Sequence, residues 1–447
     1  MLFALLTGAT QGSNNDDNKL LVILVDGFRW DYFQQFSDGE LPGFEKLQQV
    51  GVKAKYLQPV FPSYSFVNFY SLMTGLYPGV NGMVHNYMWD EKHDSEFIVG
   101  DNRPEQDQAF WWDDGEPLWI TAKKQNKRSS IWYWNGCEVT IRGYAPDFCA
   151  AYQDTPNPDK TVFETALTEA VRQLHENKTD LAAVYWEKVD WWGHAEGPSG
   201  SNVTQRIREM DQMLVDLLES LSDKENINVV MFSDHGMSQR VETDALINTL
   251  DVISESDIHK AYGSKSGPVL YIWPVEGKLT EMYDALNGLP HMTTYKKEDL
   301  PDRFHLKEHY RVAPLVLVAD EGYGILRVGG AVAFFSNPGL DDHDYEGWHG
   351  YDNNLEVMRG IFFAYGPDFK SNLQVDGFIN VEVYNVMCQV MGVTPAPNNG
   401  SLANVCEMFR GGCNASDSAN SATPRLRAAQ ISAIIILFVV TAFLRLV

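Results

Sequence analysis

The stretch Phe61-Pro62-Ser63-Tyr64-Ser65-Phe66-Val67-Asn68 lies between a strand-like segment at residues 52–56 and an apolar run that ends at Gly75. This order predicts a strand, a short turn and a helix that begins at Ser65. A serine at that position can cap the helix by accepting hydrogen bonds from free backbone N–H groups. Those N–H groups and the helix dipole also favour a bound anion. Ser65 is therefore either a helix cap or a nucleophile that faces a phosphate.

Three other apolar runs predict strands that are buried on both faces, as in a parallel sheet. They occupy residues 20–25, 181–185 and 228–232. Segments with a helical period of apolar residues separate them, for example at residues 161–176. The alternation of strands and helices predicts an α/β fold with a mostly parallel central sheet flanked by helices.

The pattern loosens at about residues 252–345, where short alternating segments and polar turns predict a smaller inserted lobe. A strand at residues 360–365 and a helix at residues 381–393 then return the chain to the main sheet. Length alone would permit two or three domains, or one large α/β domain. We expect one catalytic domain at residues 18–412 that contains the lobe.

Six acidic and imidazole side chains lie beside the predicted buried strands. They are Asp26, Asp190, His194, Asp234, His235 and His349. The carboxyl ends of parallel strands meet at one edge of a sheet, so we expect these side chains to converge. Carboxylate and imidazole ligands suit zinc, and this set with Ser65 suffices for two ions that clamp a phosphoryl transfer. Each residue alone has a simpler explanation, as a helix cap or a surface histidine, so the prediction rests on the whole set.

Charge limits the classes of partner. The chain has 35 basic and 60 acidic side chains and a formal charge of -25. Nucleic acid is not expected as a partner, because phosphate backbones need clustered lysine and arginine. An acidic protein can still bind a phosphate when metal ions supply the positive charge.

Both ends of the chain predict a secreted and anchored protein. Residues 1–17 indicate a signal segment that lacks the usual charged start, as a truncated one would. Residues 413–447 contain small residues, a polar spacer and an apolar tail, which is the order of a GPI-attachment signal. We expect Ser418 to carry the anchor on the extracellular face of the plasma membrane, with a transmembrane helix as the second choice. The glycosylation sequons begin at Asn177, Asn202, Asn399 and Asn414.

Two of the five cysteines predict a local disulfide, since Cys137 and Cys149 bracket a short loop that contains Pro146. No pair has the spacing of a cysteine zinc site.

Several motifs resemble the nucleotide pyrophosphatase/phosphodiesterase family, which belongs to the alkaline phosphatase superfamily. They are Asn86 and the residues at 25–29, 61–68, 190–198, 233–237 and 347–350. The resemblance implies an alkaline phosphatase-like fold and two zinc ions. It assigns Asp26, Ser65, Asp234 and His235 to one zinc, and Asp190, His194 and His349 to the other. It also implies that Ser65 is the nucleophile and that Asn86 binds a phosphate oxygen.

Within the family the chain resembles the choline-specific branch, the glycerophosphocholine cholinephosphodiesterases. Ser65 stands where most relatives carry threonine, and the runs at 86–90, 133–138 and 397–401 are similar to that branch. The resemblance implies a choline-containing phosphodiester substrate, such as glycerophosphocholine, lysophosphatidylcholine or sphingosylphosphocholine, and a phosphocholine ester on Ser65. It further implies an interchain disulfide at Cys406 and hence a homodimer.

The quaternary ammonium of choline cannot donate hydrogen bonds, so aromatic faces and nearby carboxylates recognise it. Tyr185 and Glu187 stand just before Asp190, and Trp132, Tyr133 and Trp134 form a second aromatic group. We expect a choline pocket from these residues.

Two rival functions remain at this stage. One is a nucleotide pyrophosphatase or phosphomonoesterase of the same superfamily, and the other is a catalytically silent adhesion ectodomain on a lipid anchor. Loss of a metal ligand would favour the silent protein, and no ligand of the expected set is missing.

Overall fold

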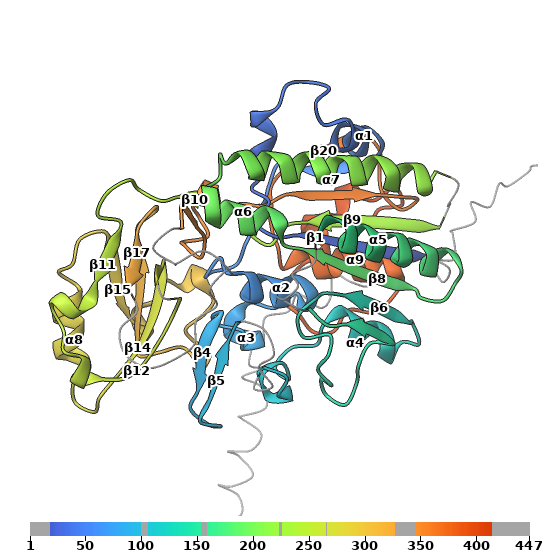
Figure 1. Ribbon diagram of the computed structural model, residues 1–447. Helices are drawn as coiled ribbons and strands as arrows, with labels where there is room; N and C mark the ends of the chain where they lie inside the picture. Colours follow the sequence, from blue (N-terminus) through green and yellow to red (C-terminus); the bar gives the residue numbers. More distant parts are fainter. Residues whose placement is uncertain are drawn as a thin grey trace, which may run out of the picture.

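The computed structural model describes residues 18–99, 106–152, 159–222, 226–264, 266–326 and 345–413. Within these residues a large sheet with helices on both faces adjoins a smaller lobe (Figure 1). The predicted signal segment at 1–17, the sequon residue Asn414 and the anchor residue Ser418 lie outside the described residues. No helix in the described part of the chain is long and apolar enough to cross a membrane.

The three apolar runs form the centre of the large sheet. Strand β1 (Lys19–Val25) pairs in parallel with β8 (Leu181–Trp186) on one side and β9 (Ile227–Phe232) on the other. Every residue of these strands is buried, as expected for strands covered on both faces. The full strand order is β20-β2-β19-β9-β1-β8-β6-β7. The outer strands are β2 (Val52–Ala54), β6 (Ser129–Trp132), β7 (Phe148–Ala150), β19 (Phe362–Tyr365) and β20 (Leu373–Val375).

Strand β19 runs antiparallel to β9 and β2, whereas the other neighbouring pairs of this sheet are parallel. The prediction of an α/β fold with a mostly parallel central sheet is therefore confirmed. The alternation of side chains along β1 divides the core between the two faces. Leu20, Val22 and Leu24 join one apolar cluster, and the residues between them join another.

Helices cover both faces of the sheet (Figure 1). On the face of Leu20 and Val22 lie α2 (Ser65–Thr74), α4 (Leu118–Lys124) and α9 (Glu382–Met391). On the other face lie α1 (Pro42–Val50), α5 (Lys160–His175), α6 (Lys188–Glu196) and α7 (Ser201–Ser220). Each fully buried leucine or valine contributes about 1.5–3 kcal/mol, so this two-sided packing fixes the strand ends that carry the charged residues.

The inserted lobe follows β9 and has its own apolar core. Its larger sheet is antiparallel in the order β12-β14-β16-β15, with β12 (Ile258–Tyr262), β14 (Val269–Pro274), β16 (Leu315–Ala319) and β15 (Met292–Lys296). A second sheet contains β11 (Leu246–Asn248), β17 (Gly324–Leu326) and β13 (Ser266–Gly267), and α8 (Leu279–Leu286) packs on the lobe. The lobe lies to the left of the central sheet in Figure 1 and begins slightly before the expected residue 252.

Short elements join the lobe to the large sheet. They are the hairpin of β4 (Tyr87–Asp90) and β5 (Ser95–Ile98), the pair of β10 (Ser238–Gln239) and β18 (Gly347–Trp348), and helix α3 (Pro78–Asn81). The pair of β3 (Leu57–Gln58) and β21 (Phe378–Ile379) lies beside β19 instead.

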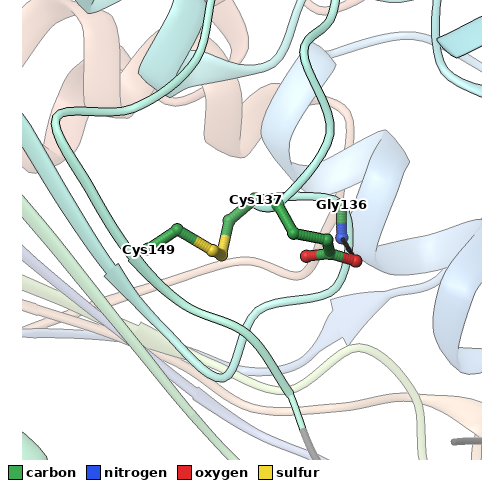
Figure 2. The surroundings of a disulfide bond; sticks show 4 residues. Gly136, Cys137 and Cys149 are labelled. Atoms are coloured by element: carbon green, nitrogen blue, oxygen red, sulfur yellow. Dashed lines mark hydrogen bonds between the residues drawn. A yellow bond between two sulfur atoms is a disulfide. The ribbon is translucent and has the colours of Figure 1, made fainter. Parts of the chain in front are cut away.

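The disulfides confirm one prediction and overturn another. Cys137 and Cys149 are paired, with their Cα atoms 5.7 Å apart (Figure 2). The prediction of an interchain bridge at Cys406 is wrong, because Cys406 pairs with Cys413 of the same chain. The backbone turns back after Cys406, which brings the two Cα atoms within 5.5 Å. A disulfide-linked dimer through Cys406 is therefore not available to this structure.

The described sequon residues differ in exposure. Asn177 and Asn399 are exposed. Asn202 is half-buried, and its side-chain amide donates to the Glu196 carboxylate.

Candidate active site

Ser65 is the first residue of α2, and its side chain does not cap the helix. The capping position is taken by Tyr64, which has extended backbone angles and makes no side-chain cap bond. The Oγ atom of Ser65 instead lies 3.1 Å from Nε2 of His235. The turn before the helix is held by Asn68, whose Oδ1 accepts from Val60 N and whose Nδ2 donates to Tyr64 O. Of the two explanations offered by the sequence, the helix cap is therefore excluded.

Three expected ligands of the first zinc surround Nε2 of the fourth ligand, His235. This nitrogen lies 3.3 Å from Asp26 Oδ1 and 3.1 Å from Asp234 Oδ2, in addition to its contact with Ser65. Asp26 follows β1, and Asp234 and His235 follow the neighbouring strand β9. The parallel pairing of these strands brings the three side chains together, as strand ends in such sheets do.

The expected ligands of the second zinc also form one group. Asp190 and His194 lie one turn apart on α6, so that His194 Nε2 is 3.4 Å from Asp190 Oδ2. His349 follows β18 and places its Nε2 3.7 Å from Asp190 Oδ1. The ligand atoms of these three residues all lie within 4.8 Å of one another. The ligand atoms of Asp190, Asp26 and His235 also lie within 4.8 Å of one another, so Asp190 lies between the two groups.

Each histidine is oriented through its other ring nitrogen. The Nδ1 atoms of His194, His235 and His349 lie 2.8 Å, 2.8 Å and 3.0 Å from the carbonyl oxygens of Gly347, Gly236 and Ser63. A carbonyl can only accept, so Nδ1 carries the proton and Nε2 is left as a metal ligand.

The cluster contains three aspartates whose negative charges lie close together, so a bound cation would stabilise it. Burial raises the pKa of Asp26, and the neighbouring charges of Asp234 and Asp190 raise it further. Burial also raises the pKa of Asp190. One oxygen of each of these three aspartates is buried without a hydrogen bond. Buried carboxylates at such distances are stable only with cations or protons between them, and the set of carboxylates, imidazoles and a hydroxyl fits zinc.

Burial lowers the pKa of His349 well below its ordinary value, and the nearby His235 and His194 lower it further. His349 is thus a neutral imidazole, which is the form that binds a metal. For His235, burial lowers the pKa, but Asp234 and the neighbouring carboxylate of Asp190 outweigh it and raise the pKa overall.

One requirement of this cluster was not expected from the sequence. Gly27 has a φ of +64°, and a Cβ atom there would lie 2.7 Å from Cβ of Asp190. Only glycine therefore allows the loop after β1 to approach α6 so closely.

A cavity of about 150 Å³ opens beside Ser65. Asn86 lines it, and its Oδ1 accepts from the backbone N–H of Phe66, so its amide N–H groups are left as donors. Ser264, Ser266 and Pro268 from the lobe line it as well. The cavity therefore lies between the large sheet and the lobe.

Two tyrosines and a carboxylate lie in the same cavity. Tyr185 donates to Asp26 Oδ2 over 2.5 Å, and Tyr152 donates to the Glu187 carboxylate. The rings of Tyr152 and Tyr185 have centroids 5.7 Å apart. Tyr185 and Glu187 thus line the cavity as expected, whereas Tyr152 was missed because it belongs to no motif.

The other aromatic group was placed wrongly by the sequence. Trp132, Tyr133 and Trp134 are not among the residues that line the cavity. Trp132 packs against Phe148 at 5.3 Å, and Trp134 packs in the core near Phe69.

Comparison with known proteins agrees with this geometry. Residues 20–352 match the profile of the family described as type I phosphodiesterase / nucleotide pyrophosphatase. The chain belongs to this family. The family consists of phosphodiesterases and pyrophosphatases, and its members are generally metal-dependent, usually with zinc.

Two relatives illustrate members that are similar over most of their length. The bis(5'-adenosyl)-triphosphatase enpp4 of Xenopus laevis is 34% identical over 399 residues, which cover 88% of this chain and 82% of that protein. Ectonucleotide pyrophosphatase/phosphodiesterase family member 5 of Homo sapiens is 32% identical over 431 residues, which cover 95% and 83%.

Solved structures of the family share the fold. Human ectonucleotide pyrophosphatase/phosphodiesterase 5 superposes with a TM-score of 0.77 at 31% identity, covering 88% of this chain and all of that one. An inactive form of the murine protein in complex with AMP gives the same values.

Proposed function

We propose that this family member hydrolyses phosphodiesters through a covalent phosphate ester on Ser65, with two zinc ions held by the two ligand groups. The observation that carries the proposal is the Ser65 hydroxyl, which does not cap its helix and lies 3.1 Å from His235 Nε2 beside the cavity. When bound, the zinc ions supply positive charge that lowers the pKa of the serine hydroxyl and of a water molecule.

The side chains and backbone of the site account for the remaining steps. Ser65 Oγ loses its proton and bonds to phosphorus while the bond to the alcohol oxygen breaks, and the alcohol oxygen takes up one proton. A water molecule then bonds to the same phosphorus, the ester bond to Ser65 breaks, and one proton of that water restores the Ser65 hydroxyl. The Asn86 amide, which is oriented by its bond from Phe66 N, and the positive end of the α2 dipole hold the phosphate oxygens as their charge develops.

The substrate class that this cavity supports best is a choline-containing phosphodiester, such as glycerophosphocholine or lysophosphatidylcholine. The faces of Tyr152 and Tyr185 and the carboxylate of Glu187 suit a quaternary ammonium. Among the described residues that line the cavity there is no lysine or arginine, and Glu187 is the acidic residue that is not expected to hold a zinc ion. This balance favours a cationic group over a second phosphate.

A nucleotide ester is the second candidate. It is supported by the relatives, which include a bis(5'-adenosyl)-triphosphatase and a protein solved in complex with AMP. The aromatic faces of Phe66 and Tyr152 in the cavity could also stack on a base.

The test compares kcat/KM of the zinc-loaded protein for glycerophosphocholine, lysophosphatidylcholine and diadenosine triphosphate. We expect the choline esters to exceed the nucleotide by about tenfold or more, which is the effect of one cation–aromatic contact. Preference for the nucleotide would establish the second candidate. No turnover of any of them at full zinc occupancy would indicate a silent ectodomain.

We further propose that the protein is held on the extracellular face of the plasma membrane by a GPI anchor near Ser418. Phosphatidylinositol-specific phospholipase should then release it from cells. Retention after complete digestion would contradict the anchor. A homodimer would need a contact other than a bridge at Cys406.

A further inference from the structure

The inserted lobe contacts the two segments that carry Ser65 and Asn86. Its strand β14 donates from Val269 N to the hydroxyl of Tyr64, the residue before Ser65, over 3.3 Å. From the same strand, Tyr271 Oη donates to Val84 O, two residues before Asn86, over 3.0 Å. Tyr271 is completely buried, and burial raises its pKa, so its hydroxyl remains a protonated donor.

A second lobe residue holds the Asn86 segment on both sides. Arg311 donates to Gly82 O over 3.0 Å and to the Asp90 carboxylate over 2.7 Å. These acceptors lie four residues before and four residues after Asn86. Both members of the ion pair are buried, with the Arg311 side chain 1% and the Asp90 side chain 0% exposed. Such a pair keeps a single geometry, because moving either partner leaves an unpaired buried charge.

The position of Asn86 depends on this segment. Its Oδ1 meets the N–H of Phe66, next to Ser65, and its own carbonyl accepts from Val99 N at the end of the hairpin. The side chain therefore bridges the segment held by the lobe and the start of α2. A shift of the segment would move the Asn86 amide away from the site where the phosphate binds.

We propose that Tyr271 and Arg311 are positioning residues, through which the inserted lobe holds the segment at 82–90 and so sets the Asn86 amide against Ser65. This rests on the proposed role of Asn86 in binding a phosphate oxygen. Donors that stabilise a developing charge act only when they are already in place, and a displacement of about 1 Å is enough to weaken them strongly. The lobe thus belongs to the catalytic framework as well as to the cavity wall.

A double-mutant cycle tests the proposal. It uses the zinc-loaded full chain, the neutral-alcohol substrate bis(p-nitrophenyl) phosphate, and the variants Tyr271→Phe, Asn86→Ala and both together. Tyr271→Phe should lower kcat about tenfold with little change in KM, as expected for the loss of one buried hydrogen bond that acts in the transition state. Asn86→Ala should lower kcat by about 10² to 10³, which leaves turnover measurable. In the Asn86→Ala background, Tyr271→Phe should cause no further loss of kcat.

The matched control is Tyr384→Phe. Tyr384 is a completely buried tyrosine on α9 whose hydroxyl accepts from Ala396 N over 2.9 Å and shares a second hydrogen bond of 2.7 Å with Thr121 Oγ1, so its loss is at least as severe as that of Tyr271. This control removes the same atom and a comparable bond away from Asn86, so kcat should stay at the wild-type value while thermal stability falls.

Unchanged kcat in Tyr271→Phe, or the same fold loss with and without Asn86, would overturn the proposal. If Tyr271→Phe does not fold, Arg311→Lys is used in the same cycle with the same criteria. An unchanged kcat in Asn86→Ala alone would instead remove the role of Asn86 that the proposed function assigns. Failure of the choline preference would leave this cycle unaffected, because its substrate carries no choline.

Discussion

Replacing Ser65 by alanine separates a nucleophile from a structural serine. The Ser65 hydroxyl makes no cap bond and contacts His235 Nε2 at 3.1 Å. Its loss removes only the hydrogen bond to His235, so the free energy of unfolding should fall by no more than about 1 kcal/mol. Loss of a nucleophile, by contrast, should lower kcat by roughly 10⁴-fold or more.

The neighbouring Ser63 provides the control with the opposite profile. It is completely buried, and its hydroxyl donates to Tyr351 O over 2.9 Å. Ser63→Ala leaves that carbonyl without its donor and should cost about 1–2 kcal/mol of unfolding free energy. The backbone carbonyl that accepts from His349 Nδ1 is unchanged, so kcat should remain close to wild type.

The assay follows release of p-nitrophenol from bis(p-nitrophenyl) phosphate at saturating zinc, together with denaturant unfolding of each variant. Saturating zinc is needed because Ser65 is also an expected ligand. Rapid acid quenching and mass spectrometry of the peptide that contains Ser65 should detect the phosphate ester in the wild-type protein. A kcat of Ser65→Ala within tenfold of wild type, or phosphate on another residue, would refute the reasoning.

Three further predictions follow from the site and its surroundings. His235→Ala should reduce bound zinc from about two ions to about one, measured by elemental analysis, and an undiminished zinc content would contradict the ligand grouping. Glu187→Gln should lower kcat/KM for glycerophosphocholine about tenfold but that for bis(p-nitrophenyl) phosphate less than threefold, since only the first substrate carries a cation; equal losses would place Glu187 outside a choline pocket. Burial raises the pKa of Asp90, but hydrogen bonds from Tyr310, Arg311 and His93 outweigh burial and lower the pKa to about 2. Because this lies below the unfolded value of about 3.9, the ionised carboxylate contributes about 2 kcal/mol that is complete above pH 4 and lost as the pH falls to about 2. Asp90→Asn should remove that acid-dependent part from the unfolding free energy, and an unaltered pH profile would show that Asp90 does not provide it.

The central sheet and the ligand cluster were predictable because their causes are local in sequence. A continuous apolar run predicts a doubly covered strand, and parallel pairing brings the residues after β1, β8 and β9 to one edge. Asp26, Asp190 and Asp234 could therefore be grouped before any contact was known. The chemistry of the site depends on which residue types follow the strands, and these can be read directly from the sequence.

The parts that were missed depend on contacts between distant segments. Tyr152 reaches the cavity because the chain after β7 passes close to the end of β8, where Tyr152 meets Glu187. Trp132 and Trp134 are large aromatic side chains in a region rich in them. Where these side chains point is set by β6 and by packing against Phe148 and Phe69. The aromatic content of a segment does not say whether its side chains face the core or the cavity. No sequence pattern in residues 266–274 predicts the hydrogen bond from Tyr271 to Val84 O.

The prediction for Cys406 is wrong for a related reason. The resemblance implies an interchain bond, whereas the partner of Cys406 is decided by the turn that brings Cys413 within reach of it. Loop geometry of this kind can change between relatives while the metal ligands stay the same.

The place where the lobe is inserted would allow the lobe to be exchanged between relatives. The chain leaves and re-enters the large sheet through β10 and β18, which pair with each other, and the rings of His235 and His349 stack with centroids 3.6 Å apart. Insertions whose ends adjoin are exchanged with little strain on the host. A lobe grafted from a relative between Gln239 and Gly347 would thus leave every expected zinc ligand in the recipient. It would at once replace the cavity wall at Pro268 and the donor at Tyr271. The proposed choline-pocket residues Tyr152, Tyr185 and Glu187 would stay in the recipient, so such an exchange would change turnover while the choline pocket is kept.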